Sequence, residues 1–324
     1  MTAGSSALTV RAATPADDEQ VLDLVRTSLG WSPSDPDEQL FRWKHRENPA
    51  GVSPAWIALD GDRVVGFRTF MRWEFLDDSN RVVRAVRAVD TATHPDYRGR
   101  GIFRTLTLAA LEELKAEGVS FVFNTPNDQS RPGYLKMGWS VVGRLPVGVH
   151  LSGVRGLVRM AKSRVPADLW SLPTAVGLDA AEALRDRSTA EALLRHAPKH
   201  GLRTNRTPEY LAWRTALAPL HYRLILAEEG RGSGGIVFRL RRRGAAVETA
   251  VIEPLVSGDA TFRRLLGGVL SQTGSDYAVG LRSSVTRGLV ALPRQGPLLA
   301  TRPLEGRTPS TPHWALALGD VELL

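Results

Sequence analysis

The sequence predicts a mixed α/β protein, an α+β mixed sheet with helices packed on its faces. Residues 56–93 contain three successive apolar, strand-like segments, separated by the turn sequences Asp60-Gly61 and 77–80. Residues 101–117 follow as a long amphipathic helix, and the short apolar strand 121–123 comes next. Because strands and helices alternate along the chain, we expect a layered arrangement of both.

The elements of the N-terminal half are expected in the order β-α-α-β-β-β-α-β-α-β. Two helix starts are marked by acidic residues around a proline, at Pro15 and at Pro36, as is common in the first turn of a helix. Gly118 ends the long helix. The expected elements are strand 7–14, helices 15–29 and 35–49, strands 56–59, 64–75 and 82–93, helix 101–117, strand 121–123, a short helix, and a strand from residue 141.

The composition excludes several classes of protein. The chain has 324 residues, 43% of them hydrophobic and 23% charged, which is typical of a folded protein of about two domains. It has no cysteine, which excludes disulfides, thiolate metal sites and a cysteine acyl-enzyme. No apolar run reaches the roughly 18 residues of a membrane helix, and the start of the sequence has no export signal. We therefore expect a cytoplasmic protein without a membrane partner.

The positive charge of the chain does not by itself predict a nucleic-acid partner. The net charge is +8, but the basic residues are 37 arginines and only 5 lysines, scattered along the chain. This pattern is more typical of a biased composition than of a docking surface for nucleic acid. An anionic small molecule as a cofactor is compatible with it.

The second half of the chain repeats the pattern of the first. Trp43 precedes a proline by six residues, and so does Trp213, with an apolar strand after each pair. Pro95 and Pro254 each precede a phenylalanine by eight residues, with a helix after each. We predict a diverged duplication, although two unrelated α/β domains remain the alternative. The predicted division is a first domain at 1–150, a helical connector at 151–203 and a second domain at 204–324.

The segment 94–104 is the part of the sequence that predicts a functional site. It joins a strand to the N-terminus of the longest helix, where free backbone N–H groups and the helix dipole favour an anion. Gly99 and Gly101 allow backbone conformations that other residues rarely adopt, and Arg98 and Arg100 add charged donors. The pattern predicts a site for a pyrophosphate. A plain glycine-rich turn with solvated arginines is the alternative.

This segment resembles the acyl-CoA-binding motif of the GNAT superfamily of N-acetyltransferases, Arg/Gln-x-x-Gly-x-Gly/Ala. Arg98 and Gly101 match the first two fixed positions, whereas Phe103 stands where the family has glycine or alanine. A second segment, 127–139, resembles the Asn-x-x-Ala-x-x-x-Tyr…Gly-Phe element of the family. The resemblance spans roughly residues 1–150 and implies a GNAT-like N-terminal domain that binds acyl-CoA.

The resemblance also implies a role for each matching residue. Tyr134 would be the general acid that protonates the leaving thiolate. Asp90 is the first candidate for the general base and Glu74 the second, with an ordered water as the alternative. The implied cofactor-binding residues are Thr91, Ala92 and Thr93 for the pantetheine arm, the backbone of Arg98, Gly99, Arg100, Gly101, Ile102 and Phe103 for the pyrophosphate, and Asn127 and Ser130 for the pantetheine or for placing the following helix.

The corresponding segment of the second half differs in charge. Aligning Pro254 with Pro95 puts residues 257–262 opposite the first motif, with Asp259 where the pyrophosphate would lie. Because like charges repel, we expect the C-terminal half to be a degenerate GNAT-like domain without a CoA site.

The function that this resemblance implies is that of an N-acetyltransferase. It would move an acetyl group from acetyl-CoA, its co-substrate, to a primary amine of a small molecule by direct attack in a ternary complex. No metal site is predicted. Two alternatives stay open: a Fem-like transferase that depends on aminoacyl-tRNA, and a CoA-binding sensor or scaffold without turnover.

Overall fold

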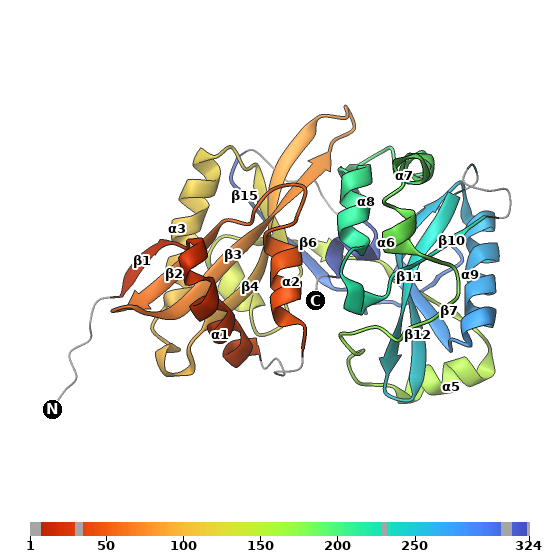
Figure 1. Cartoon of the computed structure of the whole chain (residues 1–324), viewed down its shortest axis with the longest axis horizontal. Coiled ribbons are helices and arrows are strands. Elements are labelled where there is room, and N and C mark those ends of the chain that lie inside the picture. Colours follow the sequence, from red (N-terminus) through yellow and green to blue (C-terminus); the bar gives the residue numbers. More distant parts are fainter. Residues whose placement is uncertain (1–7, 30–34, 228–231, 233, 306–312, 323–324) are drawn as a thin grey trace. The chain divides into compact units, whose positions relative to one another are not determined.

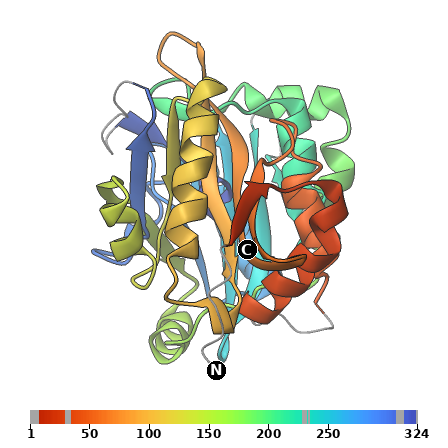
Figure 2. The ribbon, with the colours of Figure 1, turned by 90° about the vertical axis from the view of Figure 1, so that its left-hand side faces the viewer.

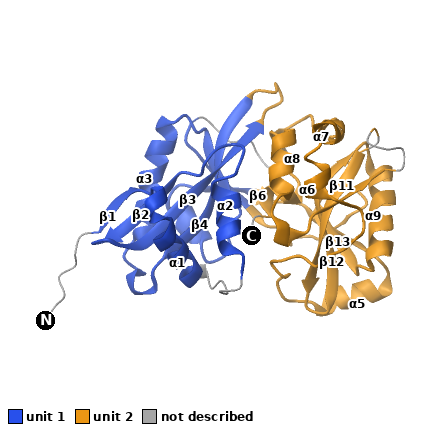
Figure 3. Cartoon of the chain, in the orientation of Figure 1, with its two compact units in different colours: residues 1–75, 82–142, 299–308 blue, residues 76–81, 143–298, 309–324 orange. Residues whose placement is uncertain are grey.

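The computed structural model of the chain describes residues 8–29, 35–227, 232, 234–305 and 313–322, and Figure 1 labels its elements. The chain divides into two compact units (Figure 3). Unit 1 contains residues 1–75, 82–142 and 299–308, and unit 2 contains residues 76–81, 143–298 and 309–324. Each unit therefore combines segments that are far apart in the sequence.

Unit 1 is built on a mixed sheet. Among the described residues its strands follow the order β1-β2-β3-β4-β5-β15-β6. The first three strands are antiparallel neighbours, β4 and β5 run parallel, and β15 lies antiparallel to β5. The strands are β1 (Thr9–Ala12), β2 (Ala55–Asp60), β3 (Arg63–Leu76), β4 (Val82–Thr93), β5 (Phe121–Asn124), β6 (Ser140–Arg144) and β15 (Leu298–Pro303).

Helices pack on both faces of this sheet. Phe67 of β3 lies in one apolar cluster with residues of α1 and α2, whereas Phe70 lies in another with α3 and α4. Figure 2 shows α3 lying across the strands of unit 1. At Gly66, also on β3, a Cβ would lie 2.3 Å from Cγ2 of Ile102, so glycine permits the close approach of α3. The helices are α1 (Asp18–Leu29), α2 (Asp37–His45), α3 (Ile102–Ala116) and α4 (Arg131–Lys136), with the 3₁₀ turns η1 (Pro15–Asp17) and η2 (Pro95–Tyr97).

Unit 2 contains a second mixed sheet. Among its described residues the strand order of this sheet is β14-β7-β13-β12-β11-β10-β8. Strands β9 and β16 pair in parallel with each other and are not part of this sheet. The strands are β7 (Val147–Leu151), β8 (Leu178–Asp179), β9 (Leu202–Thr204), β10 (Arg223–Leu226), β11 (Gly234–Arg243), β12 (Ala246–Val256), β13 (Tyr277–Leu281), β14 (Val290–Ala291) and β16 (Trp314–Ala315). The helices are α5 (Val154–Lys162), α6 (Ala180–Ala183), α7 (Arg187–Leu194), α8 (Pro208–Thr215), η3 (Ala218–Leu220), α9 (Asp259–Thr273) and α10 (Leu318–Val321).

The two units repeat one order of elements, and the mixed α/β class predicted from the sequence is confirmed. In unit 2, β10, β11 and β12 are antiparallel, a helix of 15 residues follows, and β13 lies parallel to β12. In unit 1 the helix between the parallel strands β4 and β5 also has 15 residues. None of the helices in the described residues is long and apolar enough to cross a membrane.

The two units are discontinuous in sequence, unlike the three contiguous segments predicted from the sequence. Strand β7, from the N-terminal half, pairs with β13 in unit 2, and β15, from the C-terminal half, pairs with β5 in unit 1. The division at 1–150, 151–203 and 204–324 stays a prediction. The proline spacing is also offset in the structure, because Pro95 follows β4 in η2 whereas Pro254 lies inside β12.

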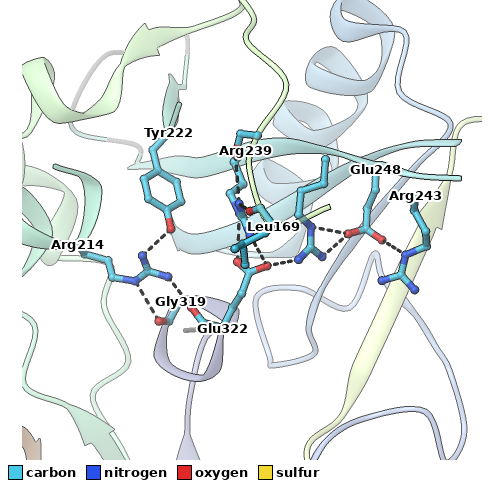
Figure 4. A network of polar contacts seen from close by, with 10 residues as sticks. Leu169, Arg214, Tyr222, Arg239, Arg243, Glu248, Gly319 and Glu322 are labelled. Carbon is cyan, nitrogen blue, oxygen red and sulfur yellow. Dashed lines mark hydrogen bonds and ion pairs between the residues drawn. The ribbon is translucent and has the colours of Figure 1, made fainter. Parts of the chain in front are cut away.

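Buried charges hold the C-terminal helix of unit 2 on its sheet (Figure 4). Nε of Arg214 donates to the carbonyl of Gly319 over 3.0 Å, and Nη2 donates to the carbonyl of Glu322 over 3.0 Å. The carboxylate of Glu322 accepts from Arg239 over 2.9 Å and also pairs with Arg241. Because breaking a buried ion pair is costly, these contacts fix the end of the described chain in unit 2.

A second buried cluster places two carboxylates on one guanidinium. Arg206 pairs with Glu253 over 2.8 Å and with Asp320 over 2.6 Å, and all three side chains are buried. Burial raises the pKa of Glu253 to about 7, because the repulsion from Asp320 adds to the desolvation and the attraction of Arg206 does not offset both. Folding therefore favours the protonated form of Glu253.

This pKa shift predicts a pH dependence of stability. A carboxyl group with a raised pKa in the folded state lowers the free energy of unfolding as the pH rises from its unfolded pKa, near 4.5, through about 7. The Glu253→Gln variant lacks this titration. We expect the loss of stability between pH 5 and pH 8 to be about 2 kcal/mol smaller in the variant than in the wild type, as measured by urea unfolding. Glu191→Gln, at an exposed ion pair on α7, is the control, and an equal pH slope in Glu253→Gln and wild type would contradict the assignment.

Candidate functional site

The turn before α3 takes a conformation that favours glycine. Gly99 and Gly101 both have φ of +76°, and Gly101 is the N-cap of α3. A Cβ at either glycine would have no atom within 4 Å, so the requirement comes from the backbone itself rather than from space. The turn leads directly into the first turn of α3, which begins at Ile102.

The N–H groups of this turn are available to a ligand. The turn is closed by hydrogen bonds from Arg98 N to Pro95 O (3.3 Å) and from Thr105 N to Gly101 O (3.0 Å). Within the described part of the chain, the N–H groups of residues 99–104 have no protein acceptor. Exposed arginines, Arg98 and Arg100, flank them. Free N–H groups, a helix N-terminus and two guanidinium groups together favour an anion such as a pyrophosphate.

Beside this turn, β4 extends beyond the end of its parallel neighbour β5. They pair only from Ala85 to Arg87 on β4, whereas β4 continues to Thr93. The predicted pantetheine-binding residues, 91–93, lie in this part of β4. Asn124 ends β5 with a buried Oδ1 that has no hydrogen-bond partner. The backbone edge of β4 that β5 leaves unpaired and this acceptor fit an extended ligand that carries amide groups, such as a pantetheine arm.

Asp90 interrupts the regular backbone of β4, at a point that we call the bulge, and it is tied to α2. Its φ of +34° is unusual for a residue other than glycine. Its carboxylate accepts from Nζ of Lys44 over 2.9 Å and lies 2.8 Å from Nε2 of His45. On the other side of the imidazole, Nδ1 lies 3.0 Å from Oγ of Ser53. The side chains of Lys44 and His45 are buried, so α2 anchors the bulge of β4.

The surroundings of Asp90 make it a weak base. Burial acts to raise the pKa of this carboxyl group, but the charge of Lys44 and the contact with His45 outweigh burial and hold the pKa below its usual range. The pKa of His45 is lowered, chiefly by burial. The role of Asp90 as general base therefore stays a prediction, and its contacts favour anchoring of the bulge. The sequence analysis did not predict a role for Lys44 or His45, because their partner, Asp90, lies on a strand that is distant in sequence.

Tyr134 lies on α4. Two other predicted residues, Asn127 and Ser130, contact each other just before this helix, and Ser130 is its N-cap. Oδ1 of Asn127 accepts from N and from Oγ of Ser130, both over 2.9 Å. This contact satisfies donors at the helix start and corresponds to the helix-placing role expected for the pair. Tyr134 is buried, and its ring contacts those of Phe103 and Trp139, with centroids 5.4 and 5.0 Å away.

The structure also explains the departure at Phe103 and reveals a residue that the sequence did not predict. Phe103 is the second residue of α3, and its ring fills the space against Gly133 and Tyr134 of α4. The hydroxyl of Tyr134 accepts from Nη2 of Arg68 over 3.0 Å. Arg68 is a charged residue within an apolar strand, which is the signal that the sequence offered.

The corresponding helix start in unit 2 is filled by its own carboxylate. Oδ1 of Asp259 accepts from N of Gly288 over 2.6 Å, and its Oδ2 accepts from Nε of Arg263 over 2.6 Å. Gly258, the N-cap of α9, has extended backbone with φ of 176°. The left-handed glycine turn of unit 1 has no counterpart at this position. Among the described residues, no group of three acidic or histidine side chains is placed to hold a metal ion.

Comparison with known proteins identifies similar domains and folds. Residues 9–142 match the family model described as an acetyltransferase (GNAT) domain. Two similar solved structures are GCN5-related N-acetyltransferases, from Anabaena variabilis (13% identity, TM-score 0.65, 92% of this chain and 73% of that chain) and from Kribbella flavida (17% identity, TM-score 0.61, 91% and 70%). A third is Eis1 from Mycobacterium abscessus (13% identity, TM-score 0.58, 92% and 74%). No curated protein matches the sequence. At these identities the structures establish a shared fold.

The ion pair of Lys44 and Asp90 gives a stability prediction. Lys44→Met leaves the buried carboxylate of Asp90 without its cation, so we expect a loss of about 3–5 kcal/mol in the free energy of unfolding. Asp90→Asn in the same chain removes the uncompensated charge and is expected to restore part of this loss. Urea unfolding at neutral pH measures both variants. A Lys44→Met variant as stable as the wild type would show that Asp90 does not depend on this cation.

Proposed function

Since residues 9–142 of this chain are a GNAT acetyltransferase domain, we propose that the protein transfers an acetyl group from acetyl-CoA to a primary amine of a small molecule. The observation that carries the proposal is the arrangement within unit 1: the glycine turn and the hydroxyl of Tyr134 belong to neighbouring helices, joined by the contact of Phe103 with Tyr134. The proposed anion site and the proposed proton donor would therefore lie on one face of the sheet, as transfer from a thioester of CoA requires.

The proposed cofactor residues divide by chemistry. The backbone of residues 98–103, with the side chains of Arg98 and Arg100, would hold the pyrophosphate. The backbone of residues 91–93 would pair with the amides of the pantetheine arm, and the free Oδ1 of Asn124 would accept from one of them. Asn127 and Ser130 would act by placing α4. Bound acetyl-CoA supplies the activated acetyl group as a thioester.

The proposed chemistry is direct attack. The amine nitrogen forms a bond to the carbonyl carbon, the bond from that carbon to sulfur breaks, and the sulfur takes a proton from the hydroxyl of Tyr134. The amine gives up one proton, so the products are an amide and a thiol. For that proton we propose water as the acceptor, because the carboxylate of Asp90 is engaged by Lys44 and His45. Asp90 would instead hold the bulge of β4.

For the C-terminal half, 204–324, we propose a diverged copy of the same fold without a CoA site. The repeated order of strands and the 15-residue helix α9 support a common origin. The carboxylate of Asp259 at the start of α9 opposes a pyrophosphate there.

The proposal is tested with acetyl-CoA and a panel of primary amines. Calorimetry is expected to detect acetyl-CoA binding, and thiol release is expected with at least one amine. A Fem-like transferase would not bind acetyl-CoA. Binding without thiol release from any amine would instead support a sensor, an alternative that the engaged carboxylate of Asp90 keeps open.

The glycine turn gives a paired prediction. Gly101→Asp introduces a strained residue and a negative charge at the N-cap of α3, so we expect acetyl-CoA to bind at least about tenfold more weakly. Gly258→Asp makes the same change at the N-cap of α9, where the backbone is extended and a Cβ meets no atom within 4 Å. This control is expected to bind acetyl-CoA as the wild type does. Equal weakening in both variants, measured by calorimetry, would contradict the assignment of the site to unit 1.

A further inference from the structure

A buried arginine joins the bulged strand to the hydroxyl of Tyr134. Arg68, on β3, is 1% exposed. Its Nη2 donates to Oη of Tyr134 over 3.0 Å, and its Nη1 donates to Oγ1 of Thr91 over 2.8 Å. Nη1 also lies 3.5 Å from the carbonyl of Val89. Thr91 and Val89 flank Asp90, so one guanidinium group contacts both sides of the bulge and the proposed acid.

Aromatic rings fill the rest of its surroundings. The guanidinium carbon of Arg68 lies 4.4 Å from the ring centre of Phe70, 5.4 Å from that of Phe103 and 5.5 Å from that of Tyr134. Its Nε is buried and has no hydrogen-bond partner. Cation–ring contacts stabilise a desolvated cation, but removal of a full charge from water costs far more than they return.

Arg68 has no anionic partner among the described residues. Its polar partners are a hydroxyl of Thr91, a hydroxyl of Tyr134 and a backbone carbonyl. Two other buried arginines have carboxylate partners: Arg206 pairs with Glu253 and Asp320, and Arg239 pairs with Glu322. A third, Arg203, is bound by carbonyl and amide oxygens, whereas Arg68 also has a buried Nε with no partner. A buried charge without a counter-ion is destabilising, so its presence beside Tyr134 needs an explanation in function.

We propose that Arg68 is a positioning residue for acetyl transfer, which orients the hydroxyl of Tyr134 and becomes its ion-pair partner when Tyr134 gives up its proton. The proposal rests on the proposed function. Because Nη2 of Arg68 donates to the oxygen, the hydroxyl hydrogen must point elsewhere, and it is free to be donated. When the bond from carbon to sulfur breaks, the electron pair goes to sulfur, the proton moves from Tyr134 to sulfur, and the tyrosinate is left facing Arg68.

This arrangement stabilises the transition state more than the ground state. Before transfer, Arg68 contacts a neutral hydroxyl, and its charge is uncompensated. During transfer, negative charge grows on the buried Oη of Tyr134, at hydrogen-bond distance from Nη2 of the buried Arg68. An interaction that strengthens as charge develops raises kcat without tightening the binding of acetyl-CoA. A later proton from solvent restores Tyr134.

The test compares Arg68 and Tyr134 in a double-mutant cycle. We expect Tyr134→Phe to lower kcat about 100-fold, and Arg68→Met to lower kcat about 10- to 100-fold, with the KM for acetyl-CoA changed less than about threefold in each. In the Tyr134→Phe background, Arg68→Met is expected to change kcat less than about threefold, because the hydroxyl through which it acts is gone.

Two further variants separate this role from a structural one. Arg68→Lys keeps the charge and a donor, and is expected to recover more than half of the logarithmic loss in kcat. Arg68→Lys also tests the proposal if Arg68→Met does not fold. Arg72→Met removes a partly buried arginine from the same strand, paired with Glu117, and is expected to leave kcat unchanged.

The outcomes distinguish this inference from the proposed function. If the wild type acetylates no amine, the proposed function fails and the role of Arg68 fails with it. If the wild type is active and Tyr134→Phe is impaired, while Arg68→Met keeps full kcat, only the role of Arg68 is overturned. The role of Arg68 would also be overturned if the losses in kcat of Arg68→Met and Tyr134→Phe multiply in the double variant. A change confined to KM in Arg68→Met would overturn it as well.

Discussion

The close packing of α3 against Gly66 is the constraint on which the candidate site of unit 1 depends. A side chain at Gly66 would collide with Ile102, the first residue of α3, so the glycine fixes how near the helix start lies to the sheet. The next residue, Phe103, then reaches the ring of Tyr134, and Arg68, two residues along the strand from Gly66, lies under both rings. The left-handed turn at Gly99 and Gly101 connects this helix to β4. One contact between a strand and a helix thus places the glycine turn and Tyr134, the proposed anion site and proton donor, together.

The parts of this site that the sequence predicted are those with local causes. The turn at residues 98–103 depends on the conformational freedom of glycine next to a helix start, which adjacent residues determine. The contact of Asn127 with Ser130 is equally local. The missed contacts join distant residues, since Lys44 meets Asp90 across 46 positions and Arg68 meets Tyr134 across 66. Local propensity does not choose such partners, because the register of strands and the packing of helices decide them. The pairing of β15 with β5 escaped prediction for the same reason.

The two units share one order of elements but differ at the N-terminus of the 15-residue helix, which is α3 in unit 1 and α9 in unit 2. In unit 1 the N-terminus of α3 has free N–H groups, exposed arginines and a backbone that requires glycine. In unit 2 the carboxylate of Asp259 is hydrogen-bonded to Gly288 and Arg263 at the start of α9, so the positive end of the helix is already compensated. The same helix dipole therefore favours a ligand in one unit and an internal contact in the other. A change of few residues at a helix start is enough to separate these outcomes.

Buried cations of this chain differ in whether a carboxylate compensates their charge, and this difference bears on function. The arginines of unit 2 with paired carboxylates, such as Arg206 and Arg239, have their charges compensated in the folded state, and they hold α10 and the sheet together. In unit 1, Lys44 compensates Asp90, whereas Arg68 meets only neutral partners among the described residues. Apolar packing by a methionine or leucine at position 68 would avoid the desolvation of a cation. A buried cation that gains its counter-ion only when a neighbouring hydroxyl ionises stabilises the reacting state selectively, and the free energy that it costs the fold is then recovered in the rate of the reaction.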